Sequence, residues 1–254
     1  MLSSGSGGNA AYISSGKSAL LIDSGLSCRE LSRRLAQIGA APDSIDAIAI
    51  THEHIDHVAG VLPLSSRYEI PIHASAGTIA GSPLHSRPGR IENLTADVPF
   101  TAGCLEVVPF PVPHDAAEPV GFTVTDGAVK VGVATDLGSQ TLEVLVSLAD
   151  SDVVVLESNH DSEMLIEGPY PWFVKQRIAS PIGHLSNADA ADLIRAVRHA
   201  GLRHLVLVHL SETNNDPAIT LESARRALGR KGAGVEISLG WQHRVGDVIV
   251  LDQA

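Results

Sequence analysis

Nine short apolar runs of strand length constrain the fold of this chain more than any other feature. They cover residues 18–23, 45–51, 104–110, 120–125, 129–135, 152–158, 204–210, 234–239 and 247–252. Three amphipathic helical patterns, at 28–39, 186–201 and 217–229, alternate with them, and each ends at a glycine. Two sheets flanked by such helices predict a layered α/β sandwich. Because no repeat or linker interrupts the pattern, we expect residues 1–254 to form a single domain.

The composition is that of a soluble globular protein, with 44% hydrophobic and 19% charged residues. No apolar run reaches the roughly 18 residues that a membrane span needs. The first residues lack the pattern of a secretory signal, and Cys28 and Cys104 are the only cysteines, so we expect a cytoplasmic protein. A net charge of −11 argues against nonspecific coating of nucleic acid, but divalent ions at a site would reverse that balance locally.

The stretch "THEHIDHVAG" at residues 51–60 follows the apolar run 45–51 directly. It places His52, His54, Asp56 and His57 within six residues, although imidazoles and carboxylates are poor residues for a dry core. Imidazole nitrogens and carboxylate oxygens are the ligands that Zn²⁺ and similar divalent ions prefer. A scattered histidine needs no such explanation, but four candidate ligands in one short segment predict a metal site.

Polar residues also end three other apolar runs. His114 follows the run 104–110, Asp136 follows 129–135, and His209 lies in 204–210. Ligands bind where a sheet presents the loops at the carboxyl ends of its strands. We therefore expect these side chains to converge on the 52–57 segment.

The order His52-x-His54-x-Asp56-His57, followed by His114, Asp136 and His209, resembles the metallo-β-lactamase superfamily. That resemblance implies a four-layer αβ/βα sandwich with a dinuclear site. It assigns one metal to His52, His54 and His114 and the second to Asp56, His57 and His209, with Asp136 bridging. The cofactors would be two divalent ions, Zn²⁺ or Mn²⁺ with Fe²⁺ also open, because such ligands accept all three.

Longer segments resemble the YycJ/WalJ branch of the superfamily. They include "SSGSGGNAAYI", "VPHDAAEPVGFTV", "ATDLG", the stretch 156–194 and "VHLSETNN". The branch implies a nuclease, most simply a 5′→3′ DNA exonuclease that attacks phosphodiesters with a metal-bridged hydroxide. Members usually carry an apolar strand before the glycine-rich loop, whereas only Met1 and Leu2 precede it here. We therefore expect either a clipped first strand or a start farther upstream.

Three residues are candidates for catalysis. Asp56 would orient the hydroxide or accept its proton. Glu157, at the end of a strand, and His184, before a helix, resemble a Glu–His pair that assists the leaving group in RNase Z-like relatives. The alternative is that Glu157 pairs with an arginine and His184 caps a helix.

Several positions stay open on sequence grounds. The glycine-rich loop could cradle a phosphate or form a tight turn, and Asn214 and Asn215 could contact substrate or form a turn. Trp172 and Phe173 could stack a base beside Lys175 and Arg177 or anchor a loop. The role of His160 stays unassigned. The histidines without partners in the sequence are assigned to the surface or to packing: His73, His85, His199, His204 and His243.

Two other functions remain alternatives. One is a hydrolase of the same fold acting on thioesters or lactones in the manner of glyoxalase II, which would leave Glu157 and His184 without a role. The other is a non-catalytic module that binds nucleic acid or a protein partner, which would be expected to have lost metal ligands. As substrate we expect nucleic acid, DNA rather than RNA, and no membrane partner. The sequence does not determine the oligomeric state.

Overall fold

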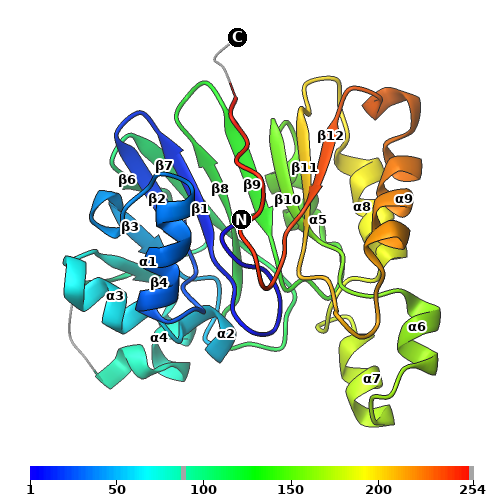
Figure 1. Ribbon diagram of the computed structural model, residues 1–254, viewed down its shortest axis with the longest axis horizontal. Helices are drawn as coiled ribbons and strands as arrows, with labels where there is room; N and C mark the ends of the chain where they lie inside the picture. The colour runs from blue at the N-terminus through cyan, green and yellow to red at the C-terminus, as the bar shows by residue number, and fades with distance from the viewer. Residues whose placement is uncertain (87–89, 252–254) are drawn as a thin grey trace.

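The computed structural model describes residues 1–86 and 90–251, and these residues build two β-sheets that face each other (Figure 1). The first sheet has the order β1-β2-β3-β4-β5. Only its β1–β2 pair is antiparallel. Its strands are β1 Ala11–Ser15, β2 Ser18–Ile22, β3 Ala47–Ala49, β4 Ile72–Ala74 and β5 Ile91–Asn93.

The second sheet is larger and mixed, with the order β12-β11-β10-β9-β8-β7-β6. The strands from β6 to β9 pair antiparallel, and those from β9 to β12 pair parallel. The strands are β6 Phe100–Ala102, β7 Leu105–Pro111, β8 Val120–Thr125, β9 Lys130–Ala134, β10 Val153–Glu157, β11 His204–Val208 and β12 Glu236–Leu239.

Helices cover the outer face of each sheet. Side chains of α1 and α3 pack on the first sheet, and those of α5, α8 and α9 pack on the second. The α-helices are α1 Cys28–Gln37, α2 Ile55–Val58, α3 Val61–Tyr68, α4 Ala76–Gly81, α5 Leu142–Leu148, α6 Ser162–Glu167, α7 Trp172–Ile178, α8 Asn187–Val197 and α9 Pro217–Leu228. Short 3₁₀ turns lie at Pro42–Ser44, Pro83–Ser86 and Gly229–Gly232.

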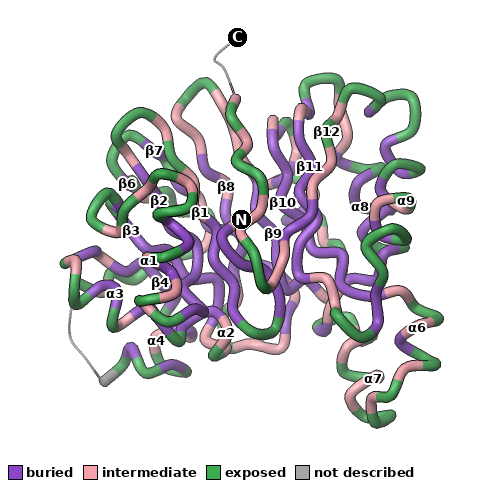
Figure 2. Tube along the Cα trace, viewed as in Figure 1, coloured by how far each residue is buried: buried purple, intermediate pink, exposed green. Residues whose placement is uncertain are grey.

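Alternation along the strands creates the layers. Leu20 and Ile22 of β2 face the second sheet, whereas Leu21 between them faces the helices. In β10, Val155 faces the inner layer and Leu156 faces the outer helices. Successive strand side chains point to opposite faces, so each strand joins two apolar layers. Figure 2 shows the buried trace following the strands, with the exposed trace on outer helices and loops. The predicted four-layer sandwich is confirmed.

Most predicted elements are confirmed, and one is wrong. Residues 120–125 form β8 as predicted, and α8 begins after Ser186, whose side chain accepts a hydrogen bond from the Asp189 amide. The segment predicted as a strand at 247–252 joins neither sheet over its described part, 247–251. Its Ile249 and Leu251 instead pack against the layer between the sheets.

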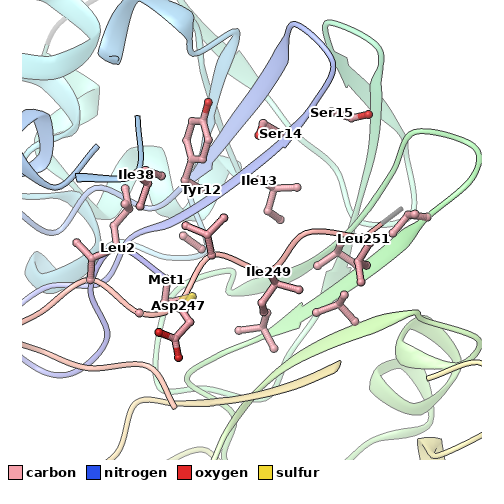
Figure 3. Close-up of a pocket in the computed structure, with 18 of the residues that line it drawn as sticks. Met1, Leu2, Tyr12, Ile13, Ser14, Ser15, Ile38, Asp247, Ile249 and Leu251 are labelled. Carbon is pink, nitrogen blue, oxygen red and sulfur yellow. The ribbon is translucent and has the colours of Figure 1, made fainter. Parts of the chain in front are cut away.

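That C-terminal segment lines a cavity of about 290 Å³ together with β1 and the first residues of β9 and β10 (Figure 3). A second cavity, of about 700 Å³, is lined by the same segment and the residues around the start of β11 and β12. Both lie at the amino ends of the parallel strands. The polar residues predicted to bind metal lie at the opposite, carboxyl ends. Within the described residues, no helix is long and apolar enough to cross a membrane.

Candidate metal centre

The 52–57 segment forms one wall of the site. It begins just after the buried strand β3 and turns into the short helix α2 at Ile55. The rings of His52, His54 and His114 lie close together, with centroids 4.5, 4.9 and 5.1 Å apart for the three pairs. One possible ligand atom from each of the three lies within 4.8 Å of the other two. The structure thus brings together the three residues that the family pattern assigns to one metal.

A second group centres on Asp136, at the end of β9. Ligand atoms of His52, His57 and Asp136 lie within 4.8 Å of one another, and Oδ2 of Asp136 is 3.2 Å from Nε2 of His57. Oδ1 of Asp136 lies 3.5 Å from Nδ1 of His209 and 3.8 Å from Nε2 of His114. Asp136 therefore lies between the residues assigned to the two metals, as a bridging ligand must.

Unpartnered buried atoms test whether this group fits a metal ion. Nε2 of His52, His114 and His209 and Oδ2 of Asp136 are buried without a hydrogen-bond partner. Such atoms are costly to bury unless something compensates them. Nδ1 of His114 lies 3.1 Å from the carbonyl oxygen of Gly183, and Nδ1 of His209 lies 2.7 Å from Oε1 of Glu157. Each Nδ1 thus carries the proton, and each Nε2 keeps a lone pair for a metal. The donor set fits divalent ions.

Burial also favours the neutral, ligating form of two of these rings. Burial lowers the pKa of His52 well below its ordinary value, and the neighbouring His57 lowers it further. Burial likewise lowers the pKa of His114, although Asp136 opposes the shift. A neutral imidazole is the form that binds a metal ion, so both rings are ready as ligands at neutral pH.

Asp23 is a supporting residue that sequence reasoning missed. Its Oδ2 lies 2.8 Å from Nδ1 of His57, and its Oδ1 accepts a hydrogen bond from the backbone N–H of Thr51. The Thr51 hydroxyl also donates to Asp23 and lies 3.0 Å from Nδ1 of His52. The available signal was that Asp23 ends the apolar run 18–23, as Asp136 ends its own.

Asp56 lies at the rim of the site. Within the described part of the chain it joins none of the three compact donor groups, which are His52/His54/His114, His52/His57/Asp136 and Asp136/Glu157/His184/His209. Its Oδ2 is 3.5 Å from Nε2 of His57 and accepts a hydrogen bond from Nδ2 of Asn9. Asn9, from the glycine-rich loop, also lies 3.0 Å from Nε2 of His57. The assignment of Asp56 to the second metal therefore stays a prediction.

Glu157 joins two histidines at one buried oxygen. Its Oε1 accepts hydrogen bonds from Nδ1 of His184 at 2.8 Å and Nδ1 of His209 at 2.7 Å, while the backbone N–H groups of Leu137 and Leu185 donate to Oε2. Burial raises the pKa of Glu157, but the two histidines outweigh burial and lower it to about 2. Burial lowers the pKa of His184, but Glu157 outweighs it and raises that pKa to about 9. Because both Glu157 oxygens are saturated, Glu157 is better suited to orient histidines than to bind metal.

Three residues of the candidate site have a strained backbone. Asp23, Asp136 and His209 have φ values of 61°, 52° and 57°, in the left-handed region that non-glycine residues adopt rarely. Each follows the end of a strand and turns its side chain into the site. Such strain persists only where surrounding contacts hold it, and it concentrates at functional sites.

The structure also places the residues that the sequence left open. Asn215 is buried and bonds to the carbonyls of Ser158 and Asn159, so its role is structural. Asn214 is fully buried beneath Gly168, which leaves no surface for substrate. His160 is buried, and its Nδ1 has no partner, so its role stays unassigned.

The remaining histidines divide between packing and surface. His73 stacks on Phe100, and His204 lies 2.9 Å from the Ser238 hydroxyl. His243 is exposed beside Glu212. In the glycine-rich loop, Asn9 accepts a hydrogen bond from the Gly5 N–H, which is the bonding of a turn.

A profile of the family described as "Beta-lactamase superfamily domain" matches residues 19–210. The chain belongs to the β-lactamase superfamily. Within the superfamily it is similar to exodeoxyribonuclease YycJ of Bacillus anthracis, with 35% identity over 92% of this chain and 90% of that protein. It is 32% identical to exodeoxyribonuclease WalJ of Streptococcus pneumoniae, over 93% of this chain and 90% of the relative. The chain is thus a YycJ-type member.

Solved structures of the superfamily share the fold. The metallo-β-lactamase fold protein YhfI of Bacillus subtilis aligns with a TM-score of 0.75 over 97% of this chain and 95% of that one, at 18% identity. The alignment spans both sheets and their outer helices. The resemblance inferred from the histidine pattern is therefore confirmed at the level of fold and family.

Proposed function

We propose that this chain is a divalent-metal-dependent exodeoxyribonuclease that hydrolyses phosphodiester bonds in DNA in the 5′→3′ direction. One observation carries the proposal: Asp136 lies between donor groups that include His52, His114 and His209, each with a buried unpartnered Nε2, in a chain related over nine-tenths of its length to exodeoxyribonucleases. DNA as the preferred substrate follows from the names of those relatives. Zn²⁺ and Mn²⁺ are the proposed ions, because histidine and carboxylate donors suit both.

Seven residues would hold two ions: His52, His54, Asp56, His57, His114, Asp136 and His209. Divalent ions in such sites supply a nucleophile at neutral pH and neutralise charge that develops on the phosphate. Asp56, at the rim, orients the attacking water through Oδ2 or takes its proton. Asn9 holds that carboxylate in place from the other side.

His184 is the proposed proton donor to the departing oxygen. Its Nδ1 is held by Glu157, so the Nε2–H is the remaining donor, and the side chain is 19% exposed at the site. Against the opposing effect of burial, Glu157 raises the pKa of His184 to about 9, which favours the protonated form of the ring. A protonated imidazole can donate to an alkoxide, which is a poor leaving group without a proton.

The deciding experiment incubates metal-analysed protein with end-labelled single- and double-stranded DNA and RNA. We expect a ladder of products that shortens from the 5′ end and is stronger with DNA. Products that shorten from the 3′ end would overturn the direction, and equal degradation of RNA would overturn the DNA preference. Endonucleolytic fragments would overturn the exonuclease assignment.

A parallel assay separates the rival hydrolases. Bis-p-nitrophenyl phosphate reports phosphodiesterase activity, S-lactoylglutathione reports thioesterase activity and nitrocefin reports lactamase activity. We expect turnover of the first substrate only. Turnover of the thioester alone would favour the glyoxalase II-like alternative, and binding of DNA without turnover of any substrate would favour a non-catalytic module.

A further inference from the structure

Helices α6 and α7 form an arm at the edge of the molecule that carries the candidate metal centre (Figure 1). The carboxyl end of α7 is fixed to that centre. The His184 N–H donates to the Ile178 carbonyl at 2.8 Å, and Gly183 lies so close to α7 that an added Cβ would be 2.2 Å from the Arg177 carbonyl. The position of α7 is therefore tied to the residue proposed as proton donor.

Arg177 reaches from α7 to the rim of the centre. Its Nε donates to Oδ2 of Asp115, and Oδ1 of Asp115 lies 3.4 Å from the metal-facing Nε2 of His114. The guanidinium thus stands one carboxylate away from a candidate metal ligand. The Arg177 side chain is 62% exposed, which leaves its terminal N–H groups accessible to a ligand. A guanidinium fork matches the geometry of a phosphate better than an ammonium group does.

Two large aromatic residues begin the same helix and lie open to solvent. Trp172 is 65% and Phe173 is 72% exposed. Phe173 precedes Arg177 by four residues, so the two side chains share one face of α7, about one turn apart. That face therefore combines an aromatic ring with a cation, and the cation lies nearer to the metal centre.

The charge on α7 favours an anionic occupant. Lys175 and Arg177 are its ionisable residues, and α7 contains no carboxylate, although the whole chain has a net charge of −11. Nζ of Lys175 donates to the Ile166 carbonyl, a neutral group, so this contact leaves the charge of Lys175 in place. The acidic side chains of the arm's helices lie on α6, at Glu163 and Glu167.

We infer that α7 is the surface that leads a single-stranded DNA segment into the site. Phe173 stacks on a base of that segment, and Arg177 contacts the phosphate next to the scissile one. This inference rests on the proposed nuclease function and deepens it. It separates binding of the strand, which α7 provides, from cleavage, which the metal centre provides. Stacking tolerates every base, so this platform suits an exonuclease that reads no sequence.

The test compares Phe173→Ala with wild type in the metal-loaded enzyme. Loss of one base–aromatic stack weakens binding roughly 5- to 100-fold, so KM for an end-labelled oligonucleotide should rise by about that factor. Turnover of bis-p-nitrophenyl phosphate, which has no neighbouring nucleotide, should change less than twofold. Phe173→Trp, which keeps an aromatic ring, should have an oligonucleotide KM close to that of wild type. Phe173→Leu, which keeps apolar area but has no aromatic ring, should show the raised KM of Phe173→Ala.

The proposed phosphate contact of Arg177 is tested by the salt dependence of KM. Arg177→Gln should flatten the dependence of log KM on log salt by about 0.7, the expected slope for one phosphate contact on a single strand. Arg177→Lys should keep most of that slope. Val248→Ala, an exposed apolar residue on the opposite edge, is the control and should match wild type. Metal content is measured for each variant, because Asp115 lies between Arg177 and His114.

Binding without cleavage separates failure of this inference from failure of the nuclease proposal. Fluorescence anisotropy with a phosphorothioate oligothymidine measures affinity for an uncleaved strand. Weaker binding by Phe173→Ala would support the role of α7 even if wild type cleaved no DNA. Equal binding by wild type and Phe173→Ala, or an equal loss on both substrates, would overturn it whether or not DNA is cleaved. Tighter binding of oligouridine would assign α7 to RNA and overturn the choice of DNA.

Discussion

Oδ2 of Asp23 lies 2.8 Å from Nδ1 of His57, and both side chains are almost fully buried. This contact turns Nε2 of His57 toward Asp136. We predict that Asp23→Asn weakens metal binding 10- to 100-fold, because an amide nitrogen opposite Nδ1 disfavours the required tautomer. Competition with a fluorescent chelator measures the affinity. Asp126→Asn, at a carboxylate that bonds to Ser15 in a distant turn, should keep wild-type affinity. Equal affinities for both variants would contradict this role of Asp23.

His184→Ala should retain its metal ions and lose turnover of DNA by about 10²- to 10⁴-fold, the usual contribution of a positioned proton donor. Activated aryl phosphodiesters should lose much less, because their leaving groups depart without a proton. Parallel kinetics on the two substrates measures the difference. Equal losses on both would show that His184 supports the structure instead.

Glu157→Gln should impair both of the histidines that Glu157 orients. The amide can accept only through its oxygen, so its NH₂ group faces either an imidazole N–H or the backbone N–H groups of Leu137 and Leu185. We expect a 10- to 100-fold loss of activity together with weaker metal binding through His209. Metal titration beside kinetics checks this. Unchanged metal affinity would confine the role of Glu157 to His184.

Removal of metal should lower the melting temperature. Ions that bind only the folded state stabilise it by about 2.7 kcal/mol at a concentration 100 times the Kd. Calorimetry with and without a chelator should show this loss as one shifted transition, which would also support the proposed single domain. His54→Ala should blunt the effect of the chelator. A melting temperature that is the same with and without the chelator would argue that the folded protein binds no divalent ions.

Gly25→Ala should displace the 52–57 segment, because Gly25 packs directly against its backbone. An added Cβ would lie 1.6 Å from the carbonyl oxygen of Asp56, so α2 and the 52–57 segment would have to move. We expect lower stability and lower metal content. Gly234→Ala is a matched control, since nothing lies within 4 Å of its added Cβ and its φ is not positive. Normal metal binding by Gly25→Ala would show that the segment adapts.

Glu30 should stabilise the protein in a pH-dependent way. Its hydrogen bonds to Arg33 and Arg34 lower its pKa to about 2. A carboxyl group with a depressed folded pKa contributes fully above its unfolded pKa, near 4.5, and the contribution disappears as the pH falls toward 2. Glu30→Gln should therefore be less stable than wild type to urea at pH 7, with the difference shrinking below pH 4. A difference that is constant with pH would exclude this linkage.

The sequence predicted the layers and several of the residues that the structure brings together at the candidate site, because both follow from local patterns. Apolar runs placed most of the strands but missed β1, β4, β5 and β6. His114, Asp136 and His209 were singled out because each is a polar residue at or just after the end of an apolar run. The supporting residues were missed for different reasons. Asn9 reaches Asp56 only through packing between segments that lie far apart in sequence, so no local pattern points to it. Asp23 ends an apolar run and Asp115 directly follows His114, but neither belongs to a cluster of candidate ligands in the sequence. The segment at 247–252 was predicted as a strand because it is a short apolar run, but in its described part Ile249 and Leu251 pack against the inner layer and extend neither sheet.

The histidines of the 52–57 segment follow β3 of the first sheet. Asp136, Glu157 and His209 lie at or just after the ends of β9, β10 and β11 of the second sheet. The thickness of the apolar layer between the sheets therefore sets the span across the reaction centre. Leu20 and Phe122 are buried in that layer, and neither belongs to a candidate donor group. They act as spacers between the sheets. Removing a methylene from either side chain should therefore shift the candidate ligands relative to one another, and the loss of activity reports how well the interior is packed.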